Sequence, residues 1–304
     1  MTLESLPDQV SIYEVSPRDG LQNEAVTVPT TRKARLIEAL VEAGLDRIEV
    51  TSFVSPRWVP QLADAEDIVK LLPDAPVRYS ALCPNPRGLE RAKRAGIKEL
   101  GVFISASETH NQKNVNDSIA GTLARFREVI APAVEAGIRV RGYISTLWGC
   151  AYEGDVDTKV GLEIAQELAD QGCYQLSLGD TIGAGTPVQT RRIVDAFLHE
   201  FPSDMVALHM HDTRGTALAN ILVGLEMGVR TFDASVGGLG GCPYAPGAAG
   251  NVATEDLVYM LHGMGVSTGI DLDLLWEAGK VAEAIVGHEL SGKVHRAGVR
   301  SLKR

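Results

Sequence analysis

Short apolar runs alternate with longer amphipathic segments along almost the whole chain. Apolar residues recur with a helical period in the longer segments, as in residues 30–45, where Leu36, Ile37, Leu40 and Val41 share one face. Several such segments end in glycine just before the next run, which is typical of a helix C-cap. The shorter runs are rich in β-branched and aromatic residues and predict eight strands, at residues 10–19, 47–53, 77–83, 99–105, 139–146, 174–180, 206–212 and 231–238.

The regular alternation of strand and helix predicts a parallel sheet covered by helices. Eight repeats favour an α/β fold closed into a (β/α)₈ TIM barrel, at about residues 10–265. A doubly wound open sheet is the alternative, but SPRDGLQNE, not a glycine-rich dinucleotide fingerprint, follows the first strand. Residues 266–304 predict a C-terminal helical extension, and because no linker interrupts the chain we expect one catalytic domain over residues 1–304.

Composition and charge narrow the class of protein. The chain is 45% hydrophobic and 22% charged, which is typical of a globular protein. A net charge of −10 without a basic run argues against a nucleic-acid partner. No stretch is apolar for long enough to span a membrane, and the N-terminus has no signal or import pattern. The four cysteines form no CxxC pair, so we expect a reduced, cytoplasmic protein.

Polar residues gather where the predicted strands end, which is where a TIM barrel carries its chemistry. Each of these residues alone would be a weak signal, but their convergence predicts an active site. They are Arg18 and Asp19 after the first strand, Glu49 in the second, Asp180 at the end of the sixth, His209, His211 and Asp212 in the seventh, and Cys242 and Asn251 after the eighth.

His209 and His211 predict a metal site. Residues two apart on a strand share a face, so both imidazoles should point into the barrel while Met210 points towards the helices. The alternative is a hydrogen-bonded pair of core histidines. Asp19 is the natural third ligand, although it could be a turn residue, and Asn251 could add an amide oxygen or instead cap a helix. Mixed nitrogen and oxygen ligands suit Mg²⁺ or Mn²⁺ better than structural zinc, although zinc and cobalt remain alternatives on ligand type.

Three further charged residues have candidate roles. Arg18 could hold a permanent positive charge over a developing oxyanion, or could be an ordinary salt-bridged arginine. Glu49 could pair with Arg18 and hold it in place. By strand alternation, Arg18 and Asp19 should point in different directions unless the end of the strand twists. Asp180 is a candidate general base, or a partner that orients a histidine.

The segment GGLGGCPYAPGAAGN (237–251) places a thiol in the most pliable part of the chain. A structural cysteine prefers a rigid, packed site, so we expect a moving loop that carries Cys242 to the substrate as a proton donor. The alternative is a small buried apolar residue. The loop lacks the spacing of a phosphate-binding loop. Arg57 and Lys113 are candidates for binding ligand phosphates, although exposed basic residues usually only solvate a surface.

Together these motifs resemble the 3-hydroxy-3-methylglutaryl-CoA lyase family. The cysteine loop is highly specific to that family, whereas the RDG and HxH pieces are shared with the wider metal-dependent Claisen superfamily. The likeness runs from about residue 10 to 290, and it rests on EVSPRDGLQNE (14–24), IEVTSFVSPRWVPQ (48–61), SLGDTIGAGTP (177–187), HMHDTRGTALAN (209–220) and GGLGGCPYAPGAAGNVATEDLVYML (237–261).

The resemblance implies a retro-Claisen cleavage of 3-hydroxy-3-methylglutaryl-CoA to acetyl-CoA and acetoacetate. It implies that Arg18 stabilises the enolate and that Cys242 is the mobile acid/base. Similar enzymes are often dimers, so we expect a homodimer. The remaining implied site residues are Glu49 and Asp180 as active-site acids, and Asp19, His209, His211 and Asn251 as ligands of a divalent metal, Mg²⁺ or Mn²⁺.

The chain departs from the family pattern at two positions, and the first of them, Arg214, leaves the acyl substrate open. Arg214 stands where an aromatic residue is common, and Met210 where a small residue is common. A longer, branched 3-hydroxyglutaryl-CoA is therefore an alternative substrate. A condensing acyl-CoA synthase of the same superfamily is a second alternative, against which the cysteine loop argues. A non-catalytic metal-binding barrel is a third.

Overall fold

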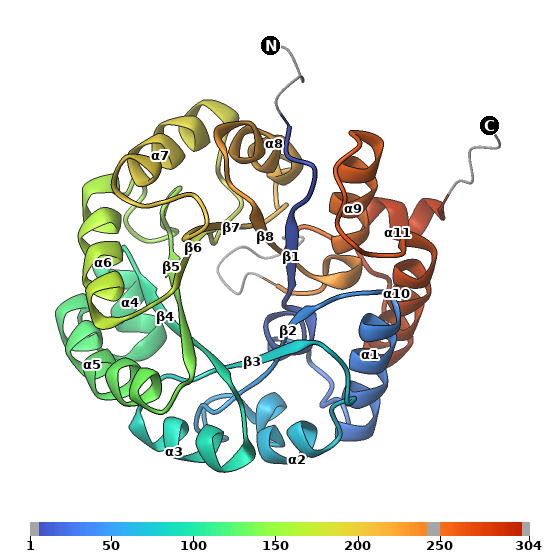
Figure 1. The fold of residues 1–304 in the computed structure, drawn as a ribbon, viewed down its shortest axis with the longest axis horizontal. Coiled ribbons are helices and arrows are strands. Elements are labelled where there is room, and N and C mark those ends of the chain that lie inside the picture. Colours follow the sequence, from blue (N-terminus) through green and yellow to red (C-terminus); the bar gives the residue numbers. More distant parts are fainter. Residues whose placement is uncertain (1–5, 242–249, 300–304) are drawn as a thin grey trace.

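The computed structural model describes residues 6–241 and 250–299. Eight parallel strands pair in chain order and close into a barrel that is surrounded by helices (Figure 1). The predicted TIM barrel is therefore confirmed, and the alternative of an open, doubly wound sheet is wrong. The strands are β1 (Ser11–Glu14), β2 (Arg47–Ser52), β3 (Arg78–Leu82), β4 (Glu99–Ser105), β5 (Arg139–Ser145), β6 (Gln175–Asp180), β7 (Val206–Met210) and β8 (Thr231–Ala234).

The helices follow the strands around the outside of the barrel, with two of them between β4 and β5 (Figure 1). None of the helices that the structure describes is long and apolar enough to cross a membrane. They are α1 (Thr30–Glu42), α2 (Ala65–Lys70), α3 (Pro86–Ala95), α4 (Glu108–Val115), α5 (Ile119–Glu135), α6 (Thr158–Gln171), α7 (Pro187–Glu200), α8 (Ala217–Met227), α9 (Thr254–Gly263), α10 (Leu272–Val286) and α11 (Lys293–Ala297).

The first strand is much shorter than the sequence predicts. β1 ends at Glu14, and residues Ser16–Gly20 form a π-helix instead of continuing the strand. Pro17 explains the break, because it has no N–H to donate to a sheet. The backbone N–H groups of Asp19 and Gly20 both donate to the carbonyl of Val15, at 2.7 and 3.2 Å. This turn places Arg18 and Asp19 at the end of the barrel.

The C-terminal extension completes the ring of helices. The apolar face of α1 is fully buried at Leu36, Ile37 and Leu40. α10 packs against α1 and α9, and the backbone N–H of Asp271 donates to the carbonyl of Ala43 at 2.8 Å. The extension thereby fills the gap between the last helix of the barrel and the first (Figure 1).

The barrel interior is polar where an aliphatic filling would be common. Arg141 is fully buried, and its guanidinium carbon lies 4.2 Å from the ring centre of Tyr13 and 4.8 Å from that of Tyr143. Its charge is balanced by Asp233, with 2.6 Å between Nη2 and Oδ1. The Arg141–Asp233 ion pair therefore occupies part of the barrel interior.

Candidate active site

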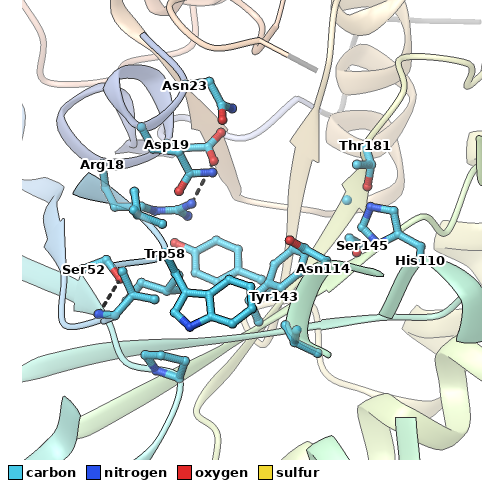
Figure 2. Close-up of a pocket in the computed structure, with 18 of the residues that line it drawn as sticks. Arg18, Asp19, Asn23, Ser52, Trp58, His110, Asn114, Tyr143, Ser145 and Thr181 are labelled. Carbon is cyan, nitrogen blue, oxygen red and sulfur yellow. Dashed lines mark hydrogen bonds and ion pairs between the residues drawn. The ribbon is translucent and has the colours of Figure 1, made fainter. Parts of the chain in front are cut away.

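A cavity of about 600 Å³ opens at the carboxyl ends of the strands. Figure 2 shows Arg18, Asp19 and Asn23 on one side of it, His110 and Thr181 on the opposite side, and the ring of Tyr143 between them. His209 and His211, the candidate metal ligands, also line the cavity. The lining residues used below are Arg18, Asp19, Trp58, Lys113, Tyr143, His209 and His211.

Three of the predicted metal ligands form one cluster in this cavity. One donor atom from each of Asp19, His209 and His211 lies within 4.8 Å of the others. The Nε2 atom of His209 is 3.2 Å from Nε2 of His211 and 3.9 Å from Oδ2 of Asp19. Met210 between the histidines is buried in the hydrophobic core, as strand alternation predicts.

Asn251 joins the cluster from the segment before α9. Its backbone bridges His211, and its amide nitrogen lies 2.8 Å from Oδ2 of Asp19. The structure thus brings together all four residues that the sequence singled out as ligands. Their role as metal ligands stays a prediction.

The chemistry of this donor set fits a divalent cation. Burial, reinforced by the neighbouring His209, lowers the pKa of His211 to about 4, so its ring is neutral near pH 7. Burial alone would raise the pKa of Asp19, but Arg18 and the histidines lower it to about 2, so it is ionised. The cluster therefore offers lone pairs and a carboxylate charge in one place, as a mixed nitrogen and oxygen site requires.

Asp233 is a site residue that the sequence reasoning missed. Its Oδ2 lies 3.2 Å from Nδ1 of His209. Burial alone would raise the pKa of Asp233, but Arg141 and His209 lower it to about 2. An ionised carboxylate at this position can accept a hydrogen bond from Nδ1–H of His209, and in that tautomer the Nε2 lone pair is directed at Asp19 and His211. Asp233 alternates with the outward-facing Phe232 on β8, so the strand pattern could have shown that it points into the barrel, but not that it contacts His209.

Arg18 is fixed by carboxylates on two sides. Its Nε lies 2.5 Å from Oε2 of Glu49, and its Nη1 lies 2.8 Å from Oδ1 of Asp19. Tyr143 Oη donates to the other oxygen of Glu49 at 3.1 Å. The expected pairing of Arg18 with Glu49 is therefore present. The expectation that Arg18 and Asp19 diverge is wrong, because a π-helix, not a strand, carries them.

Comparison with known proteins places the chain in a family. The HMGL-like family model matches residues 9–282. The chain belongs to the HMGL-like family. The resemblance seen in the motifs is thereby confirmed.

Named relatives of this HMGL-like chain are similar over nearly its full length. Hydroxymethylglutaryl-CoA lyase, mitochondrial, of Mus musculus is 52% identical over 294 residues, which cover 96% of this chain and 90% of the relative. The cytoplasmic 3-hydroxy-3-methylglutaryl-CoA lyase of the same species is 50% identical, with coverage of 97% and 86%.

Solved structures similar to this chain also include hydroxymethylglutaryl-CoA lyases. The hydroxymethylglutaryl-CoA lyase of Pseudomonas aeruginosa is 48% identical with a TM-score of 0.94, and the match covers 96% of this chain and 98% of that one. An HMG-CoA lyase from Acinetobacter baumannii, solved in complex with coenzyme A and 3-methylmalate, is 39% identical with a TM-score of 0.93, and the match covers 100% of this chain and 99% of that one.

Asp180 lies differently from the other predicted residues of this HMGL-like site. Its two oxygens accept backbone N–H groups of Ala184 and Gly185, at 3.0 and 2.8 Å. Burial raises its pKa to about 6. Asp180 does not line the described cavity, and the histidine partner is Asp233 instead. The contacts of Asp180 favour a structural role for it in the loop after β6.

The two candidate phosphate-binding residues differ in position. Lys113 lines the cavity, and its ammonium lies 4.4 Å from the ring centre of Tyr152. Arg57 is exposed and lies outside the described lining, whereas its neighbour Trp58 lines the cavity with 71% of its surface exposed. A phosphate-binding role for either basic residue stays a prediction.

Two further residues from the sequence analysis, Cys242 and Arg214, differ in whether the structure describes them. Cys242 lies outside the described residues. Arg214 is described, and its guanidinium donates to the carbonyls of Ile182 and Gly183, at 2.7 and 3.1 Å. Its charge is thus engaged by the backbone of the loop after β6, and Arg214 is not part of the described cavity lining.

Proposed function

We propose that the protein is a divalent-metal-dependent carbon–carbon lyase that cleaves 3-hydroxy-3-methylglutaryl-CoA to acetyl-CoA and acetoacetate. The observation that carries this is the cluster of Asp19, His209 and His211 beside Arg18 in one cavity. Relatives that share about half of the sequence over nearly the whole chain are named for this activity. The coenzyme A in the Acinetobacter baumannii relative supports an acyl-CoA substrate.

The metal would be held by Asp19, His209, His211 and Asn251, with Mg²⁺ or Mn²⁺ as the expected ions. When bound, such a cation supplies a Lewis acid that polarises substrate oxygen atoms. The protein's part is to present the ligands in the right state. Asp233 Oδ2, 3.2 Å from Nδ1 of His209, would favour the tautomer with its hydrogen on Nδ1, which leaves the Nε2 lone pair for the metal.

Arg18 would stabilise the charge that develops on the thioester. When the C2–C3 bond of the substrate breaks, its electron pair passes into the enolate of acetyl-CoA, while C3 becomes the ketone carbon of acetoacetate. A guanidinium that stays charged at all working pH values suits this role. Glu49 and Asp19 hold it in place before the reaction begins, which is what gives a preorganised charge its catalytic value.

Two protons must move in this reaction. One leaves the substrate's 3-hydroxyl, and His209, Asp19 and Asp180 are the candidate bases. His209 could take this proton only while its Nε2 lone pair is not bound to the metal, and Asp180 is disfavoured because backbone N–H groups occupy both its oxygens. The other is delivered to the enolate carbon, for which Cys242 is our candidate. An ordinary thiol has a pKa of about 8.5 and is mostly protonated near neutral pH, so it can donate.

The oligomeric state and the cell compartment are further parts of the proposal. Dimers are common among similar enzymes, and we expect a homodimer, which light scattering of the purified protein tests. A cytoplasmic location is supported by cytoplasmic relatives. Mitochondrial relatives are equally similar, so imaging of the tagged protein is the appropriate test.

The decisive assay uses protein stripped of metal with EDTA. We expect no cleavage of 3-hydroxy-3-methylglutaryl-CoA in that state, and release of acetyl-CoA and acetoacetate once Mg²⁺ or Mn²⁺ is added. A longer, branched 3-hydroxyglutaryl-CoA is assayed in parallel, as is condensation of acetyl-CoA with a keto acid. Absence of cleavage with either metal would refute the lyase, and faster cleavage of the longer thioester would refute the substrate.

A further inference from the structure

The end of the described chain returns to the strand ends that carry the active site. After α10 the chain turns at Gly287 in the left-handed conformation and reaches the short helix α11. In Figure 1, α11 lies beside α9 and α10, outside the ring of strands. Residues 288–295, here called the C-terminal brace, contact the segments that follow β1, β7 and β8.

The brace holds the beginning of the loop after β8. The backbone N–H of Gly292 donates to the carbonyl of Gly237 at 2.9 Å, and Ser291 Oγ donates to that of Gly238 at 3.4 Å. Leu290 packs so closely on Gly237 that a Cβ there would overlap its Cδ1. Gly237 also has a φ of +63°, so both its backbone conformation and its contacts require glycine.

The brace also reaches the residue that follows His211. The ammonium of Lys293 pairs with Oδ2 of Asp212. The other oxygen of Asp212 accepts the N–H of Ala217 at the start of α8, at 3.1 Å. The N–H of Asp212 donates at 2.9 Å to the carbonyl of Gly250, which precedes Asn251. Lys293 therefore contacts the residue that joins two of the four predicted ligands.

Asp256 on α9 anchors the brace. Its carboxylate is buried and accepts the N–H groups of Lys293 and Val294, at 3.0 and 2.6 Å. Hydrogen bonds from N–H groups to an ionised acceptor are stronger than those to a neutral one. A third contact joins His288 to Glu24 after the π-helix, with 2.9 Å between Nε2 and Oε2. All three strand-end segments that carry predicted ligands thus contact one stretch of chain.

We propose that the C-terminal brace positions the metal-binding residues, with Lys293 acting on His211 and Asn251 through Asp212. This inference rests on the proposed metal site. It assigns Lys293 a positioning role in a reaction whose substrate it does not touch. Loosening the brace is expected to free the end of β7 from the segment that carries Asn251, and so to weaken metal binding, while the barrel stays folded.

The first test measures hydrogen–deuterium exchange of backbone amides at the brace in metal-free protein. Lys293→Met removes the ammonium but keeps a long side chain, and Lys293→Arg keeps the charge. Lys70→Met is the control, because Lys70 pairs with Asp67 within α2 at 2.8 Å. In metal-free protein, the amides of Asp212 and Val252, which join the two segments, should exchange about 5- to 10-fold faster in Lys293→Met. Lys293→Arg, Lys70→Met and the amide of Leu208 inside β7 should stay near wild type.

The second test measures Mn²⁺ affinity from the EPR signal of the free ion. We expect the Kd of Lys293→Met to rise by about 3-fold, less than the roughly 10-fold that direct partners of metal ligands contribute, because Lys293 contacts Asp212 and none of the four predicted ligands. Unchanged amide exchange in Lys293→Met would overturn the positioning role of the brace, and so would equally accelerated exchange in Lys293→Arg. Faster exchange with an unchanged Kd would overturn its link to the metal. If the wild type binds no Mn²⁺, the proposed function fails, while the exchange result still decides on the brace.

Discussion

Glu255, at the start of α9, gives the protein a pH dependence that one substitution should remove. The side chain is fully buried, and its Oε2 accepts the N–H of Gly237 at 2.7 Å. Its Oε1 has no hydrogen-bond partner among the described residues and faces Nδ1 of His295 at 3.8 Å. Burial raises its pKa from 4.5 to about 8. The native protein therefore keeps a proton on Glu255 that the unfolded chain gives up.

The sign and size of the effect follow from that difference. A raised native pKa means that the stabilisation is complete below about pH 4.5 and is lost as the pH rises towards about 8. Between those limits the free energy of unfolding falls by about 1.4 kcal/mol per pH unit from this group alone. Glu255→Gln keeps the acceptor for Gly237 and cannot ionise, so it should lose this dependence. Relative to wild type, the variant should gain about 2.5 kcal/mol between about pH 5.5 and 7.5.

Urea unfolding of the wild type and Glu255→Gln across that pH range measures the difference directly. Other titrating groups are common to both proteins and cancel. Glu289→Gln is the control, because Glu289 is exposed and its substitution should leave the pH dependence parallel to that of wild type. If the curves of Glu255→Gln and wild type also run parallel, the carboxyl is ionised in the native protein and the reasoning from burial is wrong.

Three further substitutions address residues of the proposed active site and the side chains beneath it. Asp233→Asn should cost about 3 kcal/mol of unfolding free energy, because it leaves Arg141 buried without its partner, and calorimetry that finds less than about 1 kcal/mol would contradict this. Cys242→Ser should lower turnover by about 10²–10⁴ while the Mn²⁺ Kd is unchanged, and wild-type turnover would remove the thiol from the scheme. Arg18→Lys should lower kcat by about 10²–10³-fold and change KM much less, because lysine cannot contact Glu49 and Asp19 in the same geometry. An unchanged kcat would refute the role of Arg18 in stabilising the oxyanion.

The fold could be read from the sequence because its periodicities are local. Strands of period two and helices of period 3.6 each leave a pattern within a few residues, and β4 is predicted to the residue. The boundary of β1 was missed because Pro17 ends the ladder and a π-helix follows, a conformation that no hydrophobic period predicts. That error also gave Arg18 and Asp19 the wrong relative directions.

The site could be predicted only where chemistry and position coincide. His209 and His211 stand out by their HxH spacing at the end of one predicted strand. Asp233 and Arg141 do not, because a buried ion pair joins residues that are 92 positions apart and neither lies at a strand end that sequence alone would single out. No local sequence pattern predicts the contact of Lys293 with Asp212 either, since it joins the C-terminal extension to a loop 81 residues earlier.

The central claim is that Asp19, His209, His211 and Asn251 share one divalent cation. Crystals grown with Mn²⁺ and measured for anomalous scattering at the manganese edge test it most directly. The account predicts one strong peak per chain, in contact with the Asp19 carboxylate, the Nε2 atoms of both histidines and the Asn251 side chain. A peak bound elsewhere, or no peak at a Mn²⁺ concentration that supports activity, would contradict it.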